Sequence, residues 1–162
     1  NPAGRLPLTY YKSLDELPPF DDYDITKGRT YKYFKGDVLY PFGYGLSYSS
    51  FKYSDLQVKD GAGEVTVSFL LKNTGKRNGD EVAQVYVRIP ETGGIVPLKE
   101  LKGFRRVPLK SGESRRVEIK LSKEQLRYWD VEKGQFVVPK GAFDIMVGAS
   151  SKDIRLQTVI DL

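Results

Sequence analysis

Residues 64–73 read EVTVSFLLKN, and this stretch decides the fold class. Its apolar side chains Val65, Val67, Phe69 and Leu71 fall on every second position, which is the pattern of a β-strand with one buried face. The next stretch, residues 73–80, reads NTGKRNGD and is rich in Asn and Gly, which tolerate the positive φ angles of turns. The sequence therefore predicts a strand that ends in a turn.

The same alternation continues on both sides of this strand. In VAQVYVRI (residues 82–89), an apolar series alternates with Gln84, Tyr86 and Arg88. Further strand patterns occupy residues 51–58, 100–109, 115–121, 135–139, 142–149 and 154–161. Between two of them, Ser122 and Gln125 have the spacing of a capping box, which predicts one helical turn. We interpret the single tryptophan, Trp129, as a core side chain, as is common in sandwich domains.

Seven to eight short strands with almost no helix predict an all-β fold. Residues 51–162 should form an antiparallel β-sandwich of the immunoglobulin or fibronectin type III kind. We expect each strand to bury one face in the core and to expose the other to water.

Residues 1–50 differ in composition from the rest. They contain five of the nine prolines and eight of the eleven tyrosines, and no period of 2 or 3.6 continues for long. Proline disfavours long helices and central strands, but disordered linkers are poor in aromatic residues. We therefore expect an irregular, Pro- and Tyr-rich strap that buries its rings against another surface. Because the sequence begins at Asn1 without an initiator Met, we expect a piece of a longer polypeptide.

The composition excludes several kinds of chemistry. With no cysteine and no histidine, the chain has no thiolate nucleophile and no Ser-His-Asp triad. We expect no metal and no cofactor. The net charge of +5 comes with no recognition motif, so we expect no nucleic-acid partner. No apolar run approaches the roughly 18 residues that a membrane span needs.

The charged clusters have two interpretations each, and we favour the structural one. The acidic residues between 15 and 24 fit solvated loop charges better than a ligand site, and Asp80 and Glu81 follow a turn. The basic residues between Lys99 and Lys120 fit a solvated strand face better than a surface that attracts an acidic polysaccharide or a membrane. The acidic cluster comprises Asp15, Glu16, Asp21, Asp22 and Asp24.

Several ordered motifs resemble the C-terminal end of glycoside hydrolase family three enzymes of the β-glucosidase and β-xylosidase type. The resemblance starts with NPAGRLPLTYYKS (residues 1–13) and continues with LPPFDDYD, GRTYKYF and LYPFGYGLSYSSF (39–51). It extends through NTGKRNGDEVAQVYV, PLKELKGFRRVPLKSGES and LSKEQLRYWD (121–130). It thus covers essentially the whole chain.

The resemblance implies a division into two parts. Residues 1–50 would be the trailing segment of an α/β sandwich domain, and residues 51–162 a fibronectin type III-like domain. In that family the nucleophile and the acid/base lie upstream, so the resemblance implies no catalytic residue here and an inactive piece. The parent would hydrolyse O-glycosidic bonds of β-glucosides or β-xylosides with retention, and would be secreted or periplasmic.

The implied role is structural support of the catalytic domains of the same polypeptide. A carbohydrate-binding module and a generic protein-interaction sandwich remain alternatives. Two aromatic side chains, Phe42 and Tyr44, are candidates for a sugar subsite, since rings stack on pyranose faces. We favour a different role, in which four residues pack into the contact between two domains. These are Phe42, Tyr44, Leu46 and Tyr48.

Overall fold

The computed structural model describes all residues, 1–162, and is built mainly of antiparallel strands. The strap (residues 1–50) contains four short elements, and the sandwich (residues 51–162) contains the rest. In the strap these are β1 (Tyr10–Tyr11), η1 (Ile25–Lys27), α1 (Thr30–Tyr33) and β2 (Val38–Tyr40). In the sandwich they are β3 (Phe51–Asp60), β4 (Glu64–Asn73), β5 (Gly79–Arg88), β6 (Glu100–Leu109), β7 (Ser114–Ser122), η2 (Lys123–Leu126), β8 (Tyr128–Asp130), β9 (Gln135–Val137), β10 (Ala142–Gly148) and β11 (Ile154–Asp161).

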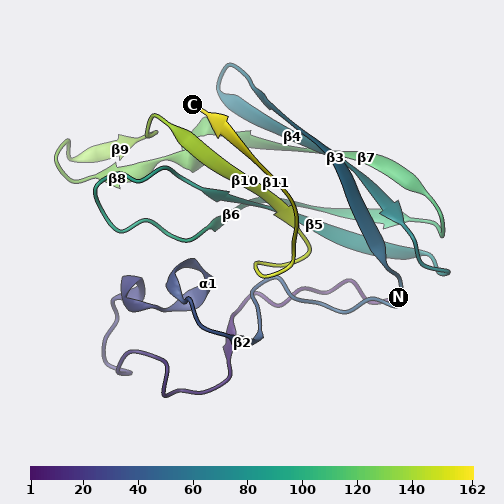
Figure 1. Cartoon of the computed structure of the whole chain (residues 1–162), viewed down its shortest axis with the longest axis horizontal. Helices are drawn as coiled ribbons and strands as arrows, with labels where there is room; N and C mark the ends of the chain where they lie inside the picture. The colour runs from purple at the N-terminus through teal and green to yellow at the C-terminus, as the bar shows by residue number, and fades with distance from the viewer.

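Two sheets form the sandwich (Figure 1). One has four strands in the order β11-β10-β5-β6, and the other has three in the order β3-β4-β7. Strands β8 and β9 form a separate hairpin. The prediction of an all-β antiparallel sandwich is confirmed.

The core lies between the two sheets and follows the alternation in the sequence. Val65, Val67, Phe69 and Leu71 on β4 are all fully buried. They are joined by inward-facing residues of the other strands, and Tyr53 on β3 stacks on Phe69 with ring centroids 5.8 Å apart. Burial of such large apolar side chains is the main stabilising contribution to the fold.

Strand β5 departs from the expected pattern because both of its faces are buried. Ala83, Val85 and Val87 face the core as predicted, but Gln84 and Tyr86 on the opposite face are also buried, at 2% and 0% exposure. The expectation that every strand exposes its second face was wrong for β5. The physical reason is that the strap covers this face.

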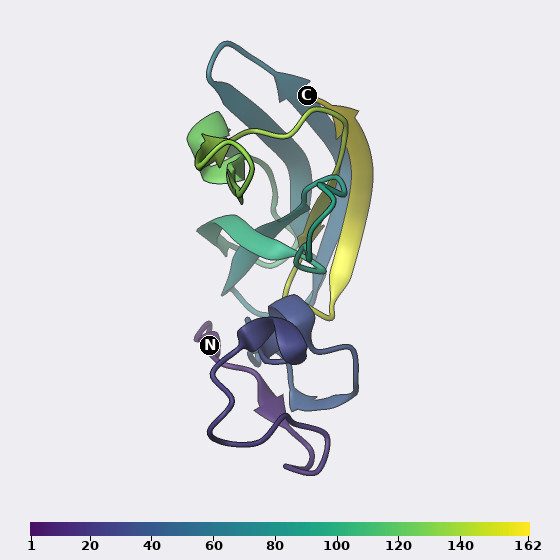
Figure 2. The same ribbon diagram turned by 90° about the vertical axis from the view of Figure 1, so that its left-hand side faces the viewer.

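The strap lies on the side of the sandwich opposite to the C-terminus in both views (Figures 1 and 2). Its two strands pair antiparallel, with Tyr10 opposite Tyr40. The N-cap of η1 is Asp24, whose side chain accepts a hydrogen bond from the Thr26 amide. Prolines and single turns prevent any longer regular element, as expected for this composition.

The structure confirms the predicted capping box and corrects the placement of Trp129. Ser122 and Gln125 cap η2 reciprocally. Trp129, in contrast, is 52% exposed, so its interpretation as a core residue was wrong. Leu126 and Tyr128 face the core, and the alternation along β8 turns Trp129 outward, where it meets Phe136 edge-on at 5.1 Å.

No helix in the structure has the length and apolar character needed to cross a membrane.

Candidate functional site

The strap and the sandwich meet at an interface held by backbone hydrogen bonds. The Phe42 carbonyl accepts a hydrogen bond from the Ser151 amide at 2.9 Å, in the turn between β10 and β11. The Lys32 carbonyl accepts one from the Leu98 amide at 2.7 Å, just before β6. The strap is therefore fixed to the sandwich at two separate places. We call this contact region the strap–sandwich interface.

An aromatic cluster fills the middle of the interface. Tyr31 of α1 stacks on Phe42 at 4.2 Å and meets Tyr86 of β5 edge-on at 5.9 Å. The Tyr31 hydroxyl accepts a hydrogen bond from the Leu101 amide at 3.0 Å. Burial raises the pKa of Tyr31 and of Tyr86 above their ordinary value, so both phenols are neutral at physiological pH. Both rings are thus packing groups with satisfied hydroxyls.

Gln84 links the two parts through its side-chain amide. Its Nε2 donates to the carbonyl oxygens of Gly43, at 3.0 Å, and Ala149, at 2.6 Å. Its Oε1 accepts from the Tyr86 hydroxyl at 2.6 Å. Gly43 has a φ of +81°, and a Cβ there would overlap the Gln84 amide. The strap therefore needs glycine at this point to approach β5 so closely.

A buried ion pair forms a second link. Arg5 of the strap contacts Glu81 of β5 at 3.1 Å, and the two side chains are only 12% and 4% exposed. The Tyr53 hydroxyl donates a second hydrogen bond to Glu81 at 2.9 Å. Burial, followed by the negative charge of Glu81, raises the pKa of Tyr53 well above its ordinary value. Glu81 is therefore a buried carboxylate whose ion-pair partner comes from the strap, while Arg155 of β11 lines the same pocket.

A third link joins α1 to the start of β6. Lys32 contacts Glu100 at 2.5 Å, and Lys102 contacts the same carboxylate at 2.9 Å. Burial alone would raise the pKa of Glu100, but the hydrogen bonds from the two lysines outweigh it and hold the pKa below the ordinary 4.5. This carboxylate therefore stays ionised at all but acidic pH.

The outer side of the strap carries an unusual amount of exposed apolar surface. Ten of the sixteen exposed large apolar side chains of the molecule lie within residues 1–50. Several border a groove of about 600 Å³. Within this groove Tyr40 lies between Tyr10, at 6.2 Å, and Tyr44, at 5.3 Å. The ten are Leu8, Tyr10, Leu14, Phe20, Tyr23, Ile25, Leu39, Tyr40, Leu46 and Tyr48.

The four predicted docking residues occupy different positions. Phe42 lies inside the strap–sandwich interface, stacked on Tyr31. Tyr44 is half-buried and lines the groove, and Leu46 and Tyr48 are exposed at 68% and 74%. Phe42 therefore faces the sandwich, whereas the other three are available to a further partner. Their roles as docking or sugar-binding residues stay predictions.

Sequence reasoning missed Arg5, Tyr31 and Gln84 as interface residues. The only local signal was at β5, where Gln84 and Tyr86 interrupt an apolar strand with large side chains. Arg5 and Tyr31 carry no such signal, because their partners lie 76 and 70 residues away in the sequence.

Outside the strap–sandwich interface, the clustered charges lie in loops or on strand faces, as expected; Lys102, which was expected on a solvated face, is only 14% exposed beside Glu100. Asp22 contacts Lys27 at 2.7 Å, and this hydrogen bond is the main reason why the pKa of Asp22 is lowered. The outward-facing basic residues of β7 pair with acidic neighbours, such as Lys120 with Glu64 at 2.7 Å. Asp80 is paired with Arg106 at 2.7 Å. No group of three or more His, Cys, Asp or Glu side chains could hold a metal ion.

The chain is similar to known protein families in sequence. Residues 81–151 match the fibronectin type III-like domain family. A xylan 1,4-beta-xylosidase from Xylanibacter ruminicola is 42% identical over 98% of this chain. That alignment covers 19% of the xylosidase and lies in its C-terminal part. The chain thus spans about a fifth of the length of the curated relatives it matches.

Solved structures of β-glucosidases are similar to this chain as well. The beta-D-glucoside glucohydrolase from Trichoderma reesei superimposes with a TM-score of 0.90 at 33% identity. A GH3 beta-glucosidase from Bifidobacterium adolescentis also gives 0.90, at 32% identity. Each comparison covers 99% of this chain and 26% of the solved one. The strap is therefore included in the similarity.

Proposed function

The chain contains a fibronectin type III-like domain and corresponds to the C-terminal part of glycoside hydrolase family three β-glucosidases and β-xylosidases, and on this premise we propose that it is a non-catalytic accessory unit that steadies the catalytic domains. The strap acts as the joint. Its inner side is fixed to the sandwich, and its outer side packs on the preceding domain of the same polypeptide.

One observation carries this proposal. The strap holds ten large apolar side chains exposed to water, although it is anchored to the sandwich by buried groups. Three of them, Tyr10, Tyr40 and Leu46, line one groove together with Tyr44, and an exposed apolar groove of this kind marks an interaction site. The sandwich buries most of its own apolar side chains, so most of the exposed apolar side chains belong to the strap. This points to a partner that packs on the strap.

The activity of the longer protein forms part of the proposal. Its relatives are named as a xylan 1,4-beta-xylosidase and a beta-D-glucoside glucohydrolase. We therefore propose a parent that hydrolyses O-glycosidic bonds of β-xylosides or β-glucosides, using carboxylates outside this chain. Secretion or periplasmic residence fits such substrates and stays a prediction.

The test uses the longer polypeptide that includes the preceding domains. Tyr40→Asp and Leu46→Asp would each place a charge on the outer side of the strap, and we expect the melting temperature of the parent to fall by several degrees. Activity well below that temperature should persist, because the reacting groups lie elsewhere. Ile95→Asp is the matched control for Leu46→Asp, since Ile95 is 71% exposed and Leu46 is 68% exposed, but Ile95 lies in the sandwich. Equal melting temperatures for all three variants would contradict the proposal.

Polysaccharide binding is a second candidate, favoured by the exposure of Trp129. The ring planes of Trp129 and Phe136 lie at 74°, so they offer one stacking face rather than a flat platform of two. Affinity electrophoresis through gels that contain neutral or acidic glycans tests this candidate. Retardation of the chain that disappears in Trp129→Ala would support binding, and unchanged migration in every gel would eliminate it.

A further inference from the structure

Five basic side chains that form no ion pair gather at one end of the sandwich. Lys76 and Arg77 lie in the turn between β4 and β5, and Lys110 lies in the turn between β6 and β7. Lys52 at the start of β3 and Lys72 at the end of β4 complete the group, and all five residues are exposed. Figure 1 shows this end at the right, near the N-terminus, with the β8–β9 hairpin at the left. We call these five residues the basic end.

Hydrogen bonds between the two turns bring these side chains together. The Ser111 hydroxyl donates to the Gly75 carbonyl at 2.8 Å, and the Ser111 amide donates to the Asn78 side-chain oxygen at 3.0 Å. Lys52 and Lys72 are direct partners across the β3–β4 ladder, so their side chains project from the same face of the sheet. The five charges therefore share one surface instead of being scattered over the molecule.

The carboxylates at this end do not balance the positive charge. Asp80 and Glu113 are each held by an arginine, at 2.7 Å and 2.6 Å. Glu118 lies on the same sheet face as Lys72 and forms no ion pair, but it is opposite Ser68, four residues and about 13 Å along β4 from Lys72. The basic end therefore keeps an excess of positive charge.

The stability of the fold does not explain this excess. Like charges directly opposite each other on neighbouring strands are destabilising, so the Lys52–Lys72 pair costs free energy. Lysine on an edge strand helps to prevent aggregation, which accounts for Lys52 on β3 but not for Lys72 on the central strand β4. Positive charge that is kept at a cost points to an anionic partner.

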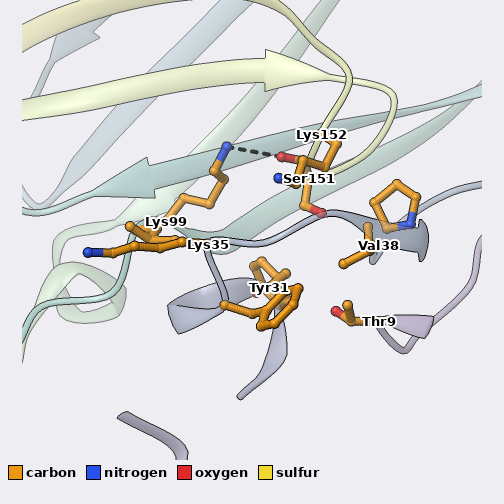
Figure 3. Close-up of a pocket in the computed structure, with 10 residues that line it drawn as sticks. Thr9, Tyr31, Lys35, Val38, Lys99, Ser151 and Lys152 are labelled. Carbon is orange, nitrogen blue, oxygen red and sulfur yellow. Dashed lines mark hydrogen bonds between the residues drawn. The ribbon is translucent and has the colours of Figure 1, made fainter. Parts of the chain in front are cut away.

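A second group of lysines, around a cavity at the strap–sandwich interface, has partners within the chain. Lys99 donates to the Ser151 carbonyl at 3.0 Å (Figure 3), and Lys152 donates to the Gly36 carbonyl at 3.3 Å. The side chains of the basic end form no such hydrogen bond, so their charged groups are free to contact a ligand.

We propose that the basic end binds an acidic polysaccharide, a sugar polymer that carries uronic-acid carboxylates. Its charges are exposed and spread over two strands and two turns, so a polymer with repeated carboxylates fits them better than one small anion, because weak contacts add up along a single chain. A membrane surface fits less well, since none of the exposed large apolar side chains lies in either turn to enter the lipid.

The choice of a polysaccharide rests on the proposed function. A parent that hydrolyses β-xylosides or β-glucosides works among sugar polymers, some of which carry uronic acids. The ammonium and guanidinium groups of the basic end would donate charge-assisted hydrogen bonds to the carboxylates of such a polymer. The sandwich would thereby hold the parent on a polymer that other parts of the protein cleave.

The first experiment measures binding of a fluorescently labelled oligogalacturonate to the 162-residue chain by fluorescence anisotropy. We expect saturable binding at about 0.01 M salt and at least about tenfold weaker binding at about 0.15 M salt, because the screening length falls from roughly 30 Å to roughly 8 Å. A labelled cello-oligosaccharide is the neutral control and should not bind. Equal binding of the neutral sugar, or no binding of the acidic one at either salt concentration, would refute the proposal.

Two double variants assign the binding to the basic end, at about 0.1 M salt, where charges act over roughly 10 Å. Lys72→Gln with Lys76→Gln should weaken binding about tenfold, because each lost contact between unit charges in water contributes a factor of up to about five. Lys35→Gln with Lys140→Gln is the matched control, since these lysines are also exposed and form no ion pair. Equal weakening in the two double variants would show that net charge alone decides, and would overturn the site.

Other ligands and another site are tested under the same conditions. Trp129→Ala should leave oligogalacturonate binding unchanged, because Trp129 lies on β8 at the opposite end of the sandwich. Loss of binding in this variant would place the site on the β8–β9 hairpin and contradict the proposal. Tighter binding of single-stranded RNA, or of vesicles that contain anionic lipid, would overturn the assignment of a polysaccharide.

The longer polypeptide separates this proposal from the proposed function. Oligogalacturonate should bind it with unchanged affinity, and Lys72→Gln with Lys76→Gln should leave its melting temperature unchanged. Loss of binding in the longer polypeptide would show that the preceding domain covers the basic end, which would overturn polysaccharide binding alone. Persistent binding, together with no effect of Tyr40→Asp and Leu46→Asp on the melting temperature, would overturn the proposed function alone.

Discussion

The strap and the sandwich bury their apolar residues to different extents. The sandwich has 112 residues, since it spans 51–162, and exposes six large apolar side chains, whereas the 50 residues of the strap expose ten. The sandwich closes two sheets over a core of its own. The strap has no core and buries only the residues that it places against β5 and the neighbouring turns, with Phe34 as its single buried apolar side chain.

This difference shows that folding and docking use separate residues. The alternating residues of β4 and β5 assemble the sandwich, while Gln84 and Tyr86 on the outer face of β5, and Glu81 near the start of this strand, receive the strap. Substitutions of the first kind should affect the whole chain. Those of the second kind should affect the strap alone, and the following experiments test this separation in order of decreasing effect.

The largest effect is expected from two phenylalanines. Phe69→Ala removes a fully buried ring and should lower the free energy of unfolding by about 3–5 kcal/mol. Phe20→Ala removes a ring that is 92% exposed and should change it by less than about 0.5 kcal/mol. Urea denaturation followed by far-ultraviolet circular dichroism measures both. A comparable loss in the two variants would show that the strap has a core of its own.

A smaller effect is expected from the buried ion pair. Arg5→Leu leaves the buried Glu81 without its ion-pair partner, which should cost up to about 3 kcal/mol. The cost cannot exceed the free energy of strap docking, because release of the strap lets water reach Glu81. In Arg5→Leu, amide hydrogen exchange should therefore become faster in residues 1–50 than it is in the unaltered chain. Exchange in the β4 core should change much less. Arg106→Leu breaks an ion pair whose arginine is 67% exposed, and is the control, with an expected cost under about 1 kcal/mol.

Gly43→Ala tests the closest approach between strap and sandwich. The added Cβ would meet a Gln84 amide that three hydrogen bonds hold in place, at a φ of +81°. We expect a loss of about 1–3 kcal/mol of docking free energy. Limited proteolysis should cut the strap faster while the thermal transition of the sandwich shifts little. Gly63→Ala has a similar positive φ, of +87°, but open space around it, so it should leave the strap protected.

The smallest effect is a pH dependence of the Lys32–Glu100 link. The pKa of Glu100 is lowered in the folded chain, so its contribution is present above the ordinary value of 4.5 and is lost as the pH falls through the lower folded value. Burial alone would lower the pKa of Lys32, but the hydrogen bond that Lys32 donates to Glu100 outweighs burial and raises it. The contribution of Lys32 is therefore lost only as the pH rises above 10.5.

Hydrogen-exchange protection of the Leu98 and Leu101 amides, which donate to the strap, should therefore be constant near neutral pH and fall in acid. Glu100→Gln should reduce this acid dependence. Glu64→Gln alters an exposed pair on the other sheet and should leave it unchanged. Identical acid profiles for the two variants would show that Glu100 does not hold the strap.

The sequence predicted the elements that depend on local period and failed where a distant partner decides. Val65 and Leu71 were placed in the core because alternation places them on one face of a strand. The same alternation predicted exposure for Gln84 and Tyr86, and nothing in the strand itself reveals that the strap covers them. Trp129 was misplaced because β8 has only three residues, too few to show which face points inward. The interface residue Arg5 could not be found, since its partner Glu81 is distant in the sequence.

The double burial of β5 has a practical consequence for protein engineering. A chain shortened to begin at Phe51 would keep every strand of the two sheets but would uncover Tyr86, Gln84 and the carboxylate of Glu81. Such a truncated domain would expose a new surface that is prone to association, next to an unpaired charge. Anyone who transplants this sandwich into a chimeric enzyme should therefore carry the strap with it, so that the exchangeable cassette is the whole of residues 1–162.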